Sequence, residues 1–329
     1  MRKKLKLLNL KKHILISLTT LIFACSTEEV VLTDDTKPLP ALYTSLSSAL
    51  SSALTSCVQN AVGKKIYRFT ELPGKANATD INKTTVFKTG DIDDRTCYAD
   101  YHQKTITLAN GSTKFVGVYK IAAGTQNQTG DPTQPRIERA SKTVNTRKKG
   151  SFVQIEGFVT INDVGFVSDN YSNGDMRDDT GTYIVQAKGT HFNATIGSND
   201  PAILLLIAKK RFENGSFKDY ALYAEVITKR GGSGDNGREL VFIKNIPKNT
   251  RKKVVMKNYF KEDNQQWVKV IVDNKTKDFR IPNTKVTING ETKYQVGKQA
   301  KIRFGAYRCK GGQAEIYWDT MKQTYNEVL

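Results

Sequence analysis

Residues that commonly bind metal ions are scarce in this chain of 329 residues. It contains three histidines and four cysteines, and no CxxC motif or other cluster of Cys and His occurs. Because zinc sites need three or four such ligands close together, a zinc centre is not expected.

The usual nucleic-acid motifs, such as a C₂H₂ finger or an RNP sequence, are also missing, so we expect no nucleic-acid partner.

The apolar run Ile14–Phe23 is too short to cross a bilayer. It follows a basic segment that begins at Arg2, a layout typical of a secretory signal peptide, and this predicts removal of residues 1–24. Leu21–Cys25 resembles a bacterial lipobox, so we expect a lipid on Cys25 that anchors an exported lipoprotein to a membrane, at the outer membrane or cell surface. An ordinary signal peptide with a chance cysteine is the alternative.

Acidic residues are few compared with basic ones. The chain has 51 Lys and Arg against 32 Asp and Glu, a formal charge of +19. Removal of residues 1–24 takes away six of the basic residues and no acidic one, which leaves +13. A protein this basic outside the cytoplasm suits a polyanion, and we expect an anionic polysaccharide. Attraction to a membrane surface is the alternative.

Three cysteines, Cys57, Cys97 and Cys309, remain after lipidation. In an oxidising compartment they allow one disulfide and leave one free thiol. We favour Cys57–Cys97, which would link the N-terminal segment to the domain, although the sequence leaves the other pairings open.

Helical periodicity is confined to Ala41–Val62, where leucine recurs every four residues. The rest alternates with period two and predicts the strands Thr113–Ile121, Ser151–Ile161, Thr182–Gly189, Ala202–Arg211, Tyr220–Lys229, Leu240–Lys244, Lys253–Tyr259, Trp267–Val272, Lys301–Arg308 and Ala314–Asp319. Turn signals such as Asn289-Gly290 separate them, without helical crossovers or internal repeats. This indicates an all-β antiparallel sandwich of the jelly-roll type. We expect residues 25–61 to form a tether with a short helix, residues 62–329 to form one domain, and the protein to be monomeric.

The strand Lys301–Arg308 has two chemically different faces. Ile302, Phe304 and Ala306 suit a core, whereas Arg303 and Tyr307 fall on the other side with Lys301 and Gly305. A glycine there leaves room for another group to approach the backbone, and we expect that group to be a sugar ring. A solvated outer face with an incidental glycine is the alternative.

Two further segments present similar faces. In Gly181–His191, Gln186 and Lys188 project side by side with Ile184, whereas Tyr183, Val185 and Ala187 are expected on the opposite face. In Pro135–Arg139, Arg136 and Glu138 share a face and Ile137 lies between them. If the faces form one surface, they gather arginine, amide, amine and phenol groups.

The segments Arg136-Ile137-Glu138, Gln186-Ala187-Lys188 and Lys301–Tyr307 resemble, in order, three motifs of the jelly-roll alginate lyases: R-x-E, Q-x-H and a strand close to Y-F-K-A-G-x-Y. The alginate lyases have histidine where this chain has Lys188. Lysine at that position, with the tyrosine retained, resembles the ulvan lyases of polysaccharide lyase family 28. Those enzymes act on sulfated, uronate-containing algal ulvan, whose sulfate groups would also account for the basic charge.

The resemblance implies β-elimination at a 4-linked uronate, with Lys188 as the base that takes the C5 proton and Tyr307 as the acid that protonates O4. Arg136, Gln186 and Arg303 would bind the substrate and stabilise its carboxylate. A base must be uncharged, and free lysine titrates near a pKa of about 10.4, so neighbouring cations and burial would have to lower it. His191 is a further substrate-binding residue and the rival base, if a turn at Gly189 redirects it.

Each residue also has a plainer interpretation. Lys188 could be a solvated charge, Tyr307 a half-buried aromatic residue, and Arg136 an ion-pair partner of Glu138. A lyase for alginate, glucuronan or a glycosaminoglycan, or a non-catalytic carbohydrate-binding lipoprotein, would use the same surface. Glycoside hydrolysis would want two carboxylates, and the motifs supply only Glu138.

The loop of residues 163–179 is rich in aspartate: Asp163, Asp169, Asp175, Asp178 and Asp179. A calcium ion is conceivable there, because hard cations favour several oxygen ligands. The spacing is not that of an EF-hand, and aspartate is also common in turns for local hydrogen bonding. No other cofactor is expected.

Overall fold

The computed structural model describes residues 65–68, 78–83, 91–94, 101–122, 135–165, 181–190, 202–230, 237–295, 297, 299–309 and 312–329. Contacts divide the chain into Met1–Ser48 and Ala49–Leu329, and every described residue belongs to the second unit. The following predicted features lie outside the described residues: the signal peptide, Cys25, the tether, the helix Ala41–Val62, Cys57, Cys97 and His191. These predictions, the domain boundaries and the monomeric state stay predictions.

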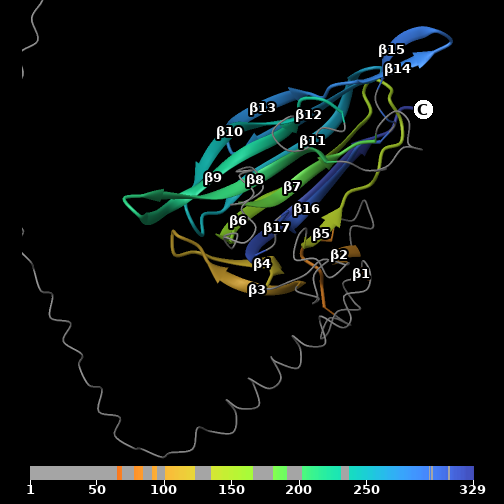
Figure 1. Cartoon of the computed structure of the whole chain (residues 1–329). Coiled ribbons are helices and arrows are strands. Elements are labelled where there is room, and N and C mark those ends of the chain that lie inside the picture. Colours follow the sequence, from red (N-terminus) through yellow and green to blue (C-terminus); the bar gives the residue numbers. More distant parts are fainter. Residues whose placement is uncertain are drawn as a thin grey trace, which may run out of the picture. The chain divides into compact units, whose positions relative to one another are not determined.

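The described residues form two antiparallel sheets and a separate hairpin (Figure 1). Sheet A has the order β1-β2-β5-β16-β7-β8-β9-β10, and sheet B has the order β13-β12-β11-β6-β17-β4-β3. The strands are β1 Lys65–Arg68, β2 Asp91–Asp94, β3 Tyr101–Thr107, β4 Thr113–Ile121, β5 Arg136–Ala140, β6 Phe152–Asp163, β7 Gly181–Lys188, β8 Ala202–Glu213, β9 Ser216–Ile227, β10 Arg238–Ile246, β11 Lys252–Glu262, β12 Gln265–Val272, β13 Lys275–Arg280, β14 Thr284–Ile288, β15 Glu291–Gln295, β16 Lys301–Tyr307 and β17 Ala314–Asn326.

This arrangement confirms the predicted all-β jelly roll. The chain passes from sheet A to sheet B and back at β5–β6–β7, and it crosses again at β16–β17. As a result β16 lies between β5 and β7, and β17 lies between β6 and β4. Every predicted strand is present; the ends differ by up to four residues, except that β17 continues from the predicted end at Asp319 to Asn326. Within the described ranges no helix has the length and apolar character needed to span a membrane.

The core lies between the two sheets and is centred on β16 and β17. Ile302, Phe304 and Ala306 are fully buried there, as the period-two pattern predicts. The Phe304 ring lies 5.6 Å from the Trp318 ring of β17 and 5.8 Å from the Tyr119 ring of β4, both edge to face. These contacts join the centres of the two sheets.

A polar cluster is buried beside this core. Arg139 of β5 is fully buried, and its Nη1 donates to Oδ2 of Asp80 at 2.5 Å. The guanidinium also lies 4.5 Å from the centre of the Tyr101 ring. Because a buried charge is tolerated only when it is paired and hydrogen-bonded, Asp80 fixes the short segment that carries it against β5.

Tight turns connect the hairpins where the sequence supplies asparagine and glycine. Asn214 and Gly215 have φ values of 51° and 77° between β8 and β9. Asn289 and Gly290 have φ values of 52° and 79° between β14 and β15, which confirms the turn predicted there. Both pairs match the left-handed conformation that a two-residue hairpin turn requires.

Candidate active site

The three sequence motifs lie on three neighbouring strands of sheet A. Strand β16 pairs antiparallel with β5 on one side and with β7 on the other (Figure 1). The register sets Tyr307 opposite Arg136 on β5, and on β7 it sets Arg303 opposite Gln186. Because directly paired side chains project from the same face, the motifs form one surface on the side of sheet A away from the core.

Gly305 corrects one expectation about this surface. Its φ is +143°, a conformation that other residues rarely adopt. A Cβ atom there would collide with the carbonyl oxygen of Ile137 and would lie 2.9 Å from Cδ1 of Tyr119. The glycine is therefore required by the backbone conformation and by the close approach of β5, and not by a sugar ring.

Tyr183 is on the opposite face from the one predicted. The register with β8 shifts between Tyr183 and Val185, so a β-bulge displaces the alternation by one residue. Ile184, predicted on the face of Gln186, instead joins the core together with Val185, whereas Tyr183 packs with its ring 5.3 Å from that of Tyr307. Gln186 lies beyond the bulge, and its predicted direction holds.

Lys188 lies at the end of β7, with Lys301 directly opposite on β16. Asn258 of sheet B holds both strand ends in place, because its Nδ2 donates to the carbonyl oxygens of Lys188 at 2.8 Å and Lys301 at 3.2 Å. Like charges directly opposite each other repel. Lys188 keeps 8% of its surface exposed. The rival base His191 lies outside the described residues, so the choice between the two stays open.

Gln186 and Arg303 belong to a buried polar network. The Nε2 of Gln186 donates to Oε1 of Glu138, and Nη1 of Arg303 donates to Oδ2 of Asp93. Arg303 Nη1 also lies 3.9 Å from Oε2 of Glu138. An amide nitrogen carries two hydrogens, so the bond to Glu138 uses only one of those on Gln186. The network fixes Gln186 and Arg303 side by side.

Arg136 and Tyr307 are stacked. The guanidinium carbon of Arg136 lies 4.1 Å from the centre of the Tyr307 ring. Nε of Arg136 is buried and has no hydrogen-bond partner. Arg136 therefore presents a buried, unused donor at the candidate site, as an anion-binding residue would.

The Tyr307 phenol is held in its protonated form. Burial raises its pKa well above the usual value, and Cys309 adds to the increase. The Cys309 Sγ donates to the Tyr307 hydroxyl at 3.1 Å. The positive charge of Arg136 acts in the opposite direction and lowers the pKa. The net result is a neutral phenol that retains 8% exposure.

The sequence motifs do not identify three further acidic or phenolic residues of this face: Tyr183, Glu225 and Asp93. Tyr183 donates from its hydroxyl to Oε2 of Glu225 on β9 at 2.6 Å, and Nη1 of Arg238 lies 3.2 Å from the other Glu225 oxygen. Asp93 of β2 is the third. Glu225 could have been found from the sequence, because an acid inside an apolar strand needs a buried partner. Asp93 stands in a short acidic segment without such a signal.

The structure provides no support for calcium at Asp163. Lys210 Nζ lies 2.8 Å from one carboxylate oxygen of Asp163, and Gln313 Nε2 donates to the other at 3.0 Å. Burial alone would raise the pKa of Asp163, but these bonds and one from the Gly165 amide lower it. The other four aspartates lie outside the described residues, and within the described ones no group of three acidic, His or Cys side chains is placed to hold a metal.

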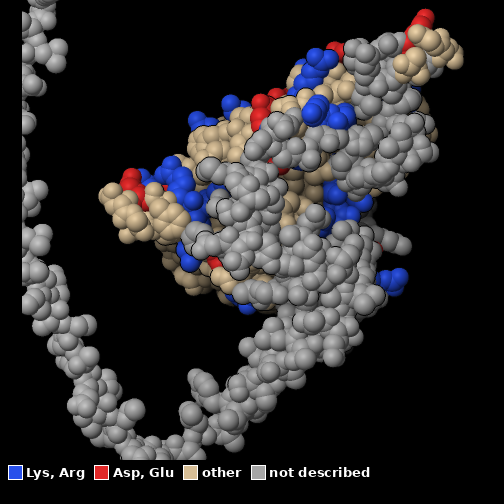
Figure 2. Space-filling view, viewed as in Figure 1, with Lys and Arg blue, Asp and Glu red and all other residues tan. Residues whose placement is uncertain are grey.

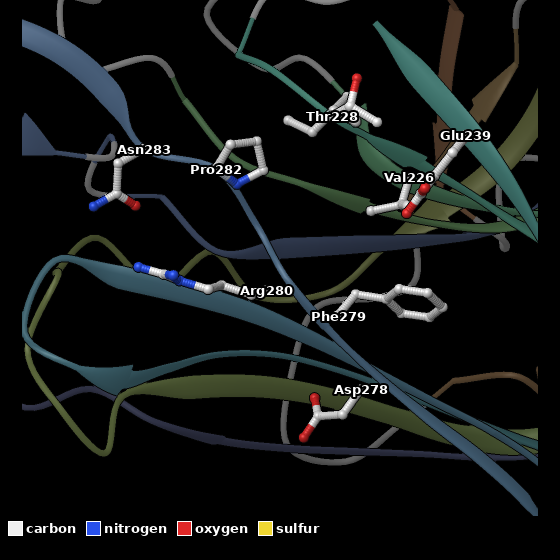
Figure 3. Close-up of a pocket in the computed structure, with 9 residues that line it drawn as sticks. Val226, Thr228, Glu239, Asp278, Phe279, Arg280, Pro282 and Asn283 are labelled. Carbon is white, nitrogen blue, oxygen red and sulfur yellow. The ribbon is translucent and has the colours of Figure 1, made fainter.

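A cavity of about 770 Å³ lies away from the motif face, between the ends of β9 and β10 and strand β13. Figure 3 shows Asp278, Phe279 and Arg280 projecting from one strand, with Glu239 on another. Arg280 Nε donates to Gln265 Oε1 at 2.9 Å. None of the predicted site residues lines this cavity, and it does not combine an amine with a phenol. The candidate active site is therefore the face of β5, β16 and β7.

Comparison with known proteins agrees with the resemblance seen in the motifs. An endo-acting ulvan lyase of Formosa agariphila is 35% identical over 278 residues, which cover 82% of this chain and 46% of that protein. Ulvan lyase NLR42 of Nonlabens ulvanivorans is 32% identical over 261 residues, covering 76% of this chain and 44% of that protein. The chain thus spans less than half the length of these curated relatives.

Among solved structures, alginate lyase AlyC3 aligns with a TM-score of 0.43 and 12% sequence identity, over 71% of this chain and 91% of that one. The family model for PL28 ulvan lyases matches residues 48–327. That range contains all three motifs and nearly every described residue. The chain belongs to the PL28 ulvan lyase family.

Proposed function

We propose that this chain is a polysaccharide lyase that cleaves a uronate-containing anionic polysaccharide, ulvan, by β-elimination. The observation that carries the proposal is the convergence of Lys188, Gln186, Arg136, Arg303 and Tyr307 on one face of three adjacent strands. Membership of the PL28 family supports it, as do the names of the two relatives. The excess of basic residues suits a polymer that carries sulfate and carboxylate groups.

Lys188 and Tyr307 divide the proton transfers between them. Lys188 takes the proton from C5 of the uronate, and the electron pair forms a double bond between C4 and C5 while the C4–O4 bond breaks. Tyr307 gives its proton to O4, which leaves as a hydroxyl group. No water is consumed. Lys188 acts in its uncharged form, and burial keeps the Tyr307 proton in place.

The substrate carboxylate gains negative charge as the C5 proton leaves. The second amide hydrogen of Gln186 and the buried Nε of Arg136 are preorganised donors for this charge. Arg303 adds positive charge beside them, although its ion pair with Asp93 offsets part of it. These groups would stabilise the developing charge without moving.

The test is the ultraviolet absorbance of unsaturated uronate after the protein is mixed with ulvan, alginate, glucuronan or heparin. We expect signal with ulvan above all. A stronger signal with another polymer would make that polymer, and not ulvan, the substrate. No signal with any of them would leave the alternative of a carbohydrate-binding lipoprotein.

Two variants test the assigned roles. Lys188→Ala and Tyr307→Phe should each lower kcat by roughly 10²-fold or more, the usual contribution of a positioned acid or base. Lys277→Ala and Tyr325→Phe, on the other sheet, are matched controls that should retain full activity. If Lys188→Ala stays active and His191→Ala does not, His191 is the base.

We also propose that the protein is exported and lipidated at Cys25, on the basis of the lipobox-like sequence Leu21–Cys25 and the preceding signal-like segment. Mass spectrometry of the mature N-terminus should find residues 1–24 removed and acyl chains on Cys25, and Cys25→Ala should release the protein from the membrane fraction. An unmodified cysteine in the wild type would contradict the proposal.

A further inference from the structure

A row of paired residues crosses sheet A from the proposed catalytic tyrosine to the last strand, β10. Successive partners, one per strand, are Tyr307 on β16, Tyr183 on β7, Ile207 on β8, Tyr223 on β9 and Phe242 on β10. Because each member is directly opposite the next, all of them project from the face that carries the candidate active site.

Side-chain packing follows the same line. Tyr183, Ile207 and Tyr307 form a buried apolar cluster on this face, and Tyr223 packs against it. The row continues to Phe242, whose ring centre lies 5.6 Å from that of Tyr223, with 69° between the ring planes. The apolar surface therefore runs from the site to the edge of the sheet, with aromatic rings on every strand except β8.

Phe242 does not contribute its side chain to the core between the sheets. Its side chain is 48% exposed, whereas its neighbour Ile243 supplies the buried apolar group on the inner side of β10. In an edge-to-face pair, the ring that presents its edge keeps both of its faces free of its partner. An exposed aromatic ring with a free face, continuous with a carbohydrate site, is suited to stacking on the apolar face of a sugar.

Distance and charge indicate which sugar this would be. Four strand spacings separate β16 from β10, so Phe242 lies about 19 Å from Tyr307. Lys209 is two residues from Ile207 on β8 and projects from the same face. Figure 2 shows basic and acidic side chains together around the β8–β9 hairpin, where Lys210, Arg211 and Lys218 form ion pairs with Asp163, Asp219 and Glu213. Lys209 therefore places a positive charge beside the row that an anionic polymer would follow, whereas a short oligosaccharide bound at the site cannot reach its end.

We propose that Phe242, supported by Tyr223, is a distal sugar-binding subsite that stacks on a ring of the same polyuronate chain, several units away from the bond that is cut. This inference rests on the proposed function. The subsite would hold the polymer across sheet A and would contribute to affinity for long chains, not to the chemical step.

The test compares Phe242→Ala on polymeric ulvan and on the shortest ulvan oligosaccharide that the wild type cleaves. We expect a roughly fivefold to tenfold higher KM on the polymer, an unchanged kcat, and unchanged kcat/KM on the oligosaccharide. Phe242→Trp should restore the wild-type KM, whereas Phe242→Leu, apolar but without a ring, should not. Phe115→Ala is the matched control, because Phe115 is 46% exposed but belongs to sheet B.

Other outcomes would overturn the inference. An unchanged KM on the polymer would exclude a subsite, and equal losses on both substrates would indicate a structural role. If Phe242 instead joins two copies of the chain at the edge of β10, light scattering will show a dimer that Phe242→Ala dissociates. If the wild type cleaves no polyuronate, the proposed function fails. The subsite is then tested by migration in native gels that contain ulvan, where equal retention of wild type and Phe242→Ala would exclude it.

Discussion

At the scale of single residues, the chemistry of the site depends on whether Tyr307 holds its proton. A general acid loses activity as the pH rises through its pKa, and here burial raises that pKa well above 10. Free tyrosine would begin to ionise near pH 10. The alkaline limb of kcat for the wild type should therefore lie above pH 10, which a pH–rate profile on ulvan would test, provided that folding is checked at each pH.

Substitution of Cys309 provides a sharper test of the raised pKa of Tyr307. It is the second cause of the raised pKa, because the negative charge of an ionised Cys309, 3.1 Å from the phenol, opposes ionisation of Tyr307. Cys309→Ala removes that contribution and should move the alkaline limb of kcat to lower pH, with KM little changed. Cys309→Ser also removes the ionisable thiol, and its hydroxyl can donate to the phenolate, so it should move the limb at least as far. Identical profiles for the three proteins would show that Cys309 only fills space.

At the scale of strands, the period-two pattern predicts correctly which face each side chain occupies on β16 and β5, but less well on β7. Ile302, Phe304 and Ala306 point inward as expected, and so does Ile137 between Arg136 and Glu138. On β7 the pattern is wrong at Tyr183 and Ile184, because a bulge is produced by pairing with β8 and leaves no mark in the sequence of β7 itself. The motifs predict the site residues on three strands, but not the partners Asp93 and Glu225, which only the sheet order brings close.

Some strands could not be predicted at all, and β13 shows why. Its residues are mostly exposed and charged, as suits the edge of sheet B, where charges discourage pairing with another chain. Such a strand packs only Phe279 against the core and therefore shows no alternation to detect. The same strand pairs with β12 through its backbone, whose hydrogen bonds do not depend on side-chain pattern.

Gly305 is the residue on which the geometry of β16 depends most. Gly305→Ala would force a side chain into a φ of +143° and against the carbonyl of Ile137. We expect a loss of roughly 2–4 kcal/mol in the free energy of unfolding, measured in urea, together with reduced activity because Tyr307 is displaced. Gly157→Ala is the control, because its Cβ would meet the flexible end of Met321 and it lacks a positive φ, so it should cost about 1 kcal/mol or less. Equal losses in both variants would contradict this account.

At the scale of the whole molecule, the buried Asp80–Arg139 pair ties a short segment to sheet A. Both side chains are almost fully buried and hydrogen-bonded to each other. Arg139→Met should destabilise the fold by about 3–5 kcal/mol, because Asp80 is left as an unpaired buried charge. The double variant Arg139→Met/Asp80→Leu should recover much of this loss. If the double variant is as unstable as the sum of the single changes, the pair is not coupled.

The fold as a whole should be sensitive to alkali, because several tyrosines are buried as neutral groups. Burial raises the pKa of Tyr101, Tyr119, Tyr220, Tyr307 and Tyr317 above the value near 10 expected in the unfolded chain. A raised pKa in the folded state adds stability that is fully present below pH 10 and is lost as the pH rises through the folded values. Burial lowers the pKa of Arg230 and Arg308 to about 10, which acts in the opposite direction, but there are fewer such residues and arginine rarely loses its proton.

The tyrosines should therefore dominate. We expect the free energy of unfolding to be nearly constant between about pH 8 and pH 9 and to fall above about pH 10, as measured by urea unfolding at each pH. Tyr119→Phe removes one buried phenol from the cluster beside Arg139 and should flatten the decline, even if the variant is less stable at neutral pH. A stability that does not change up to about pH 11 would mean that the buried phenols ionise without cost, contrary to their burial in the folded protein.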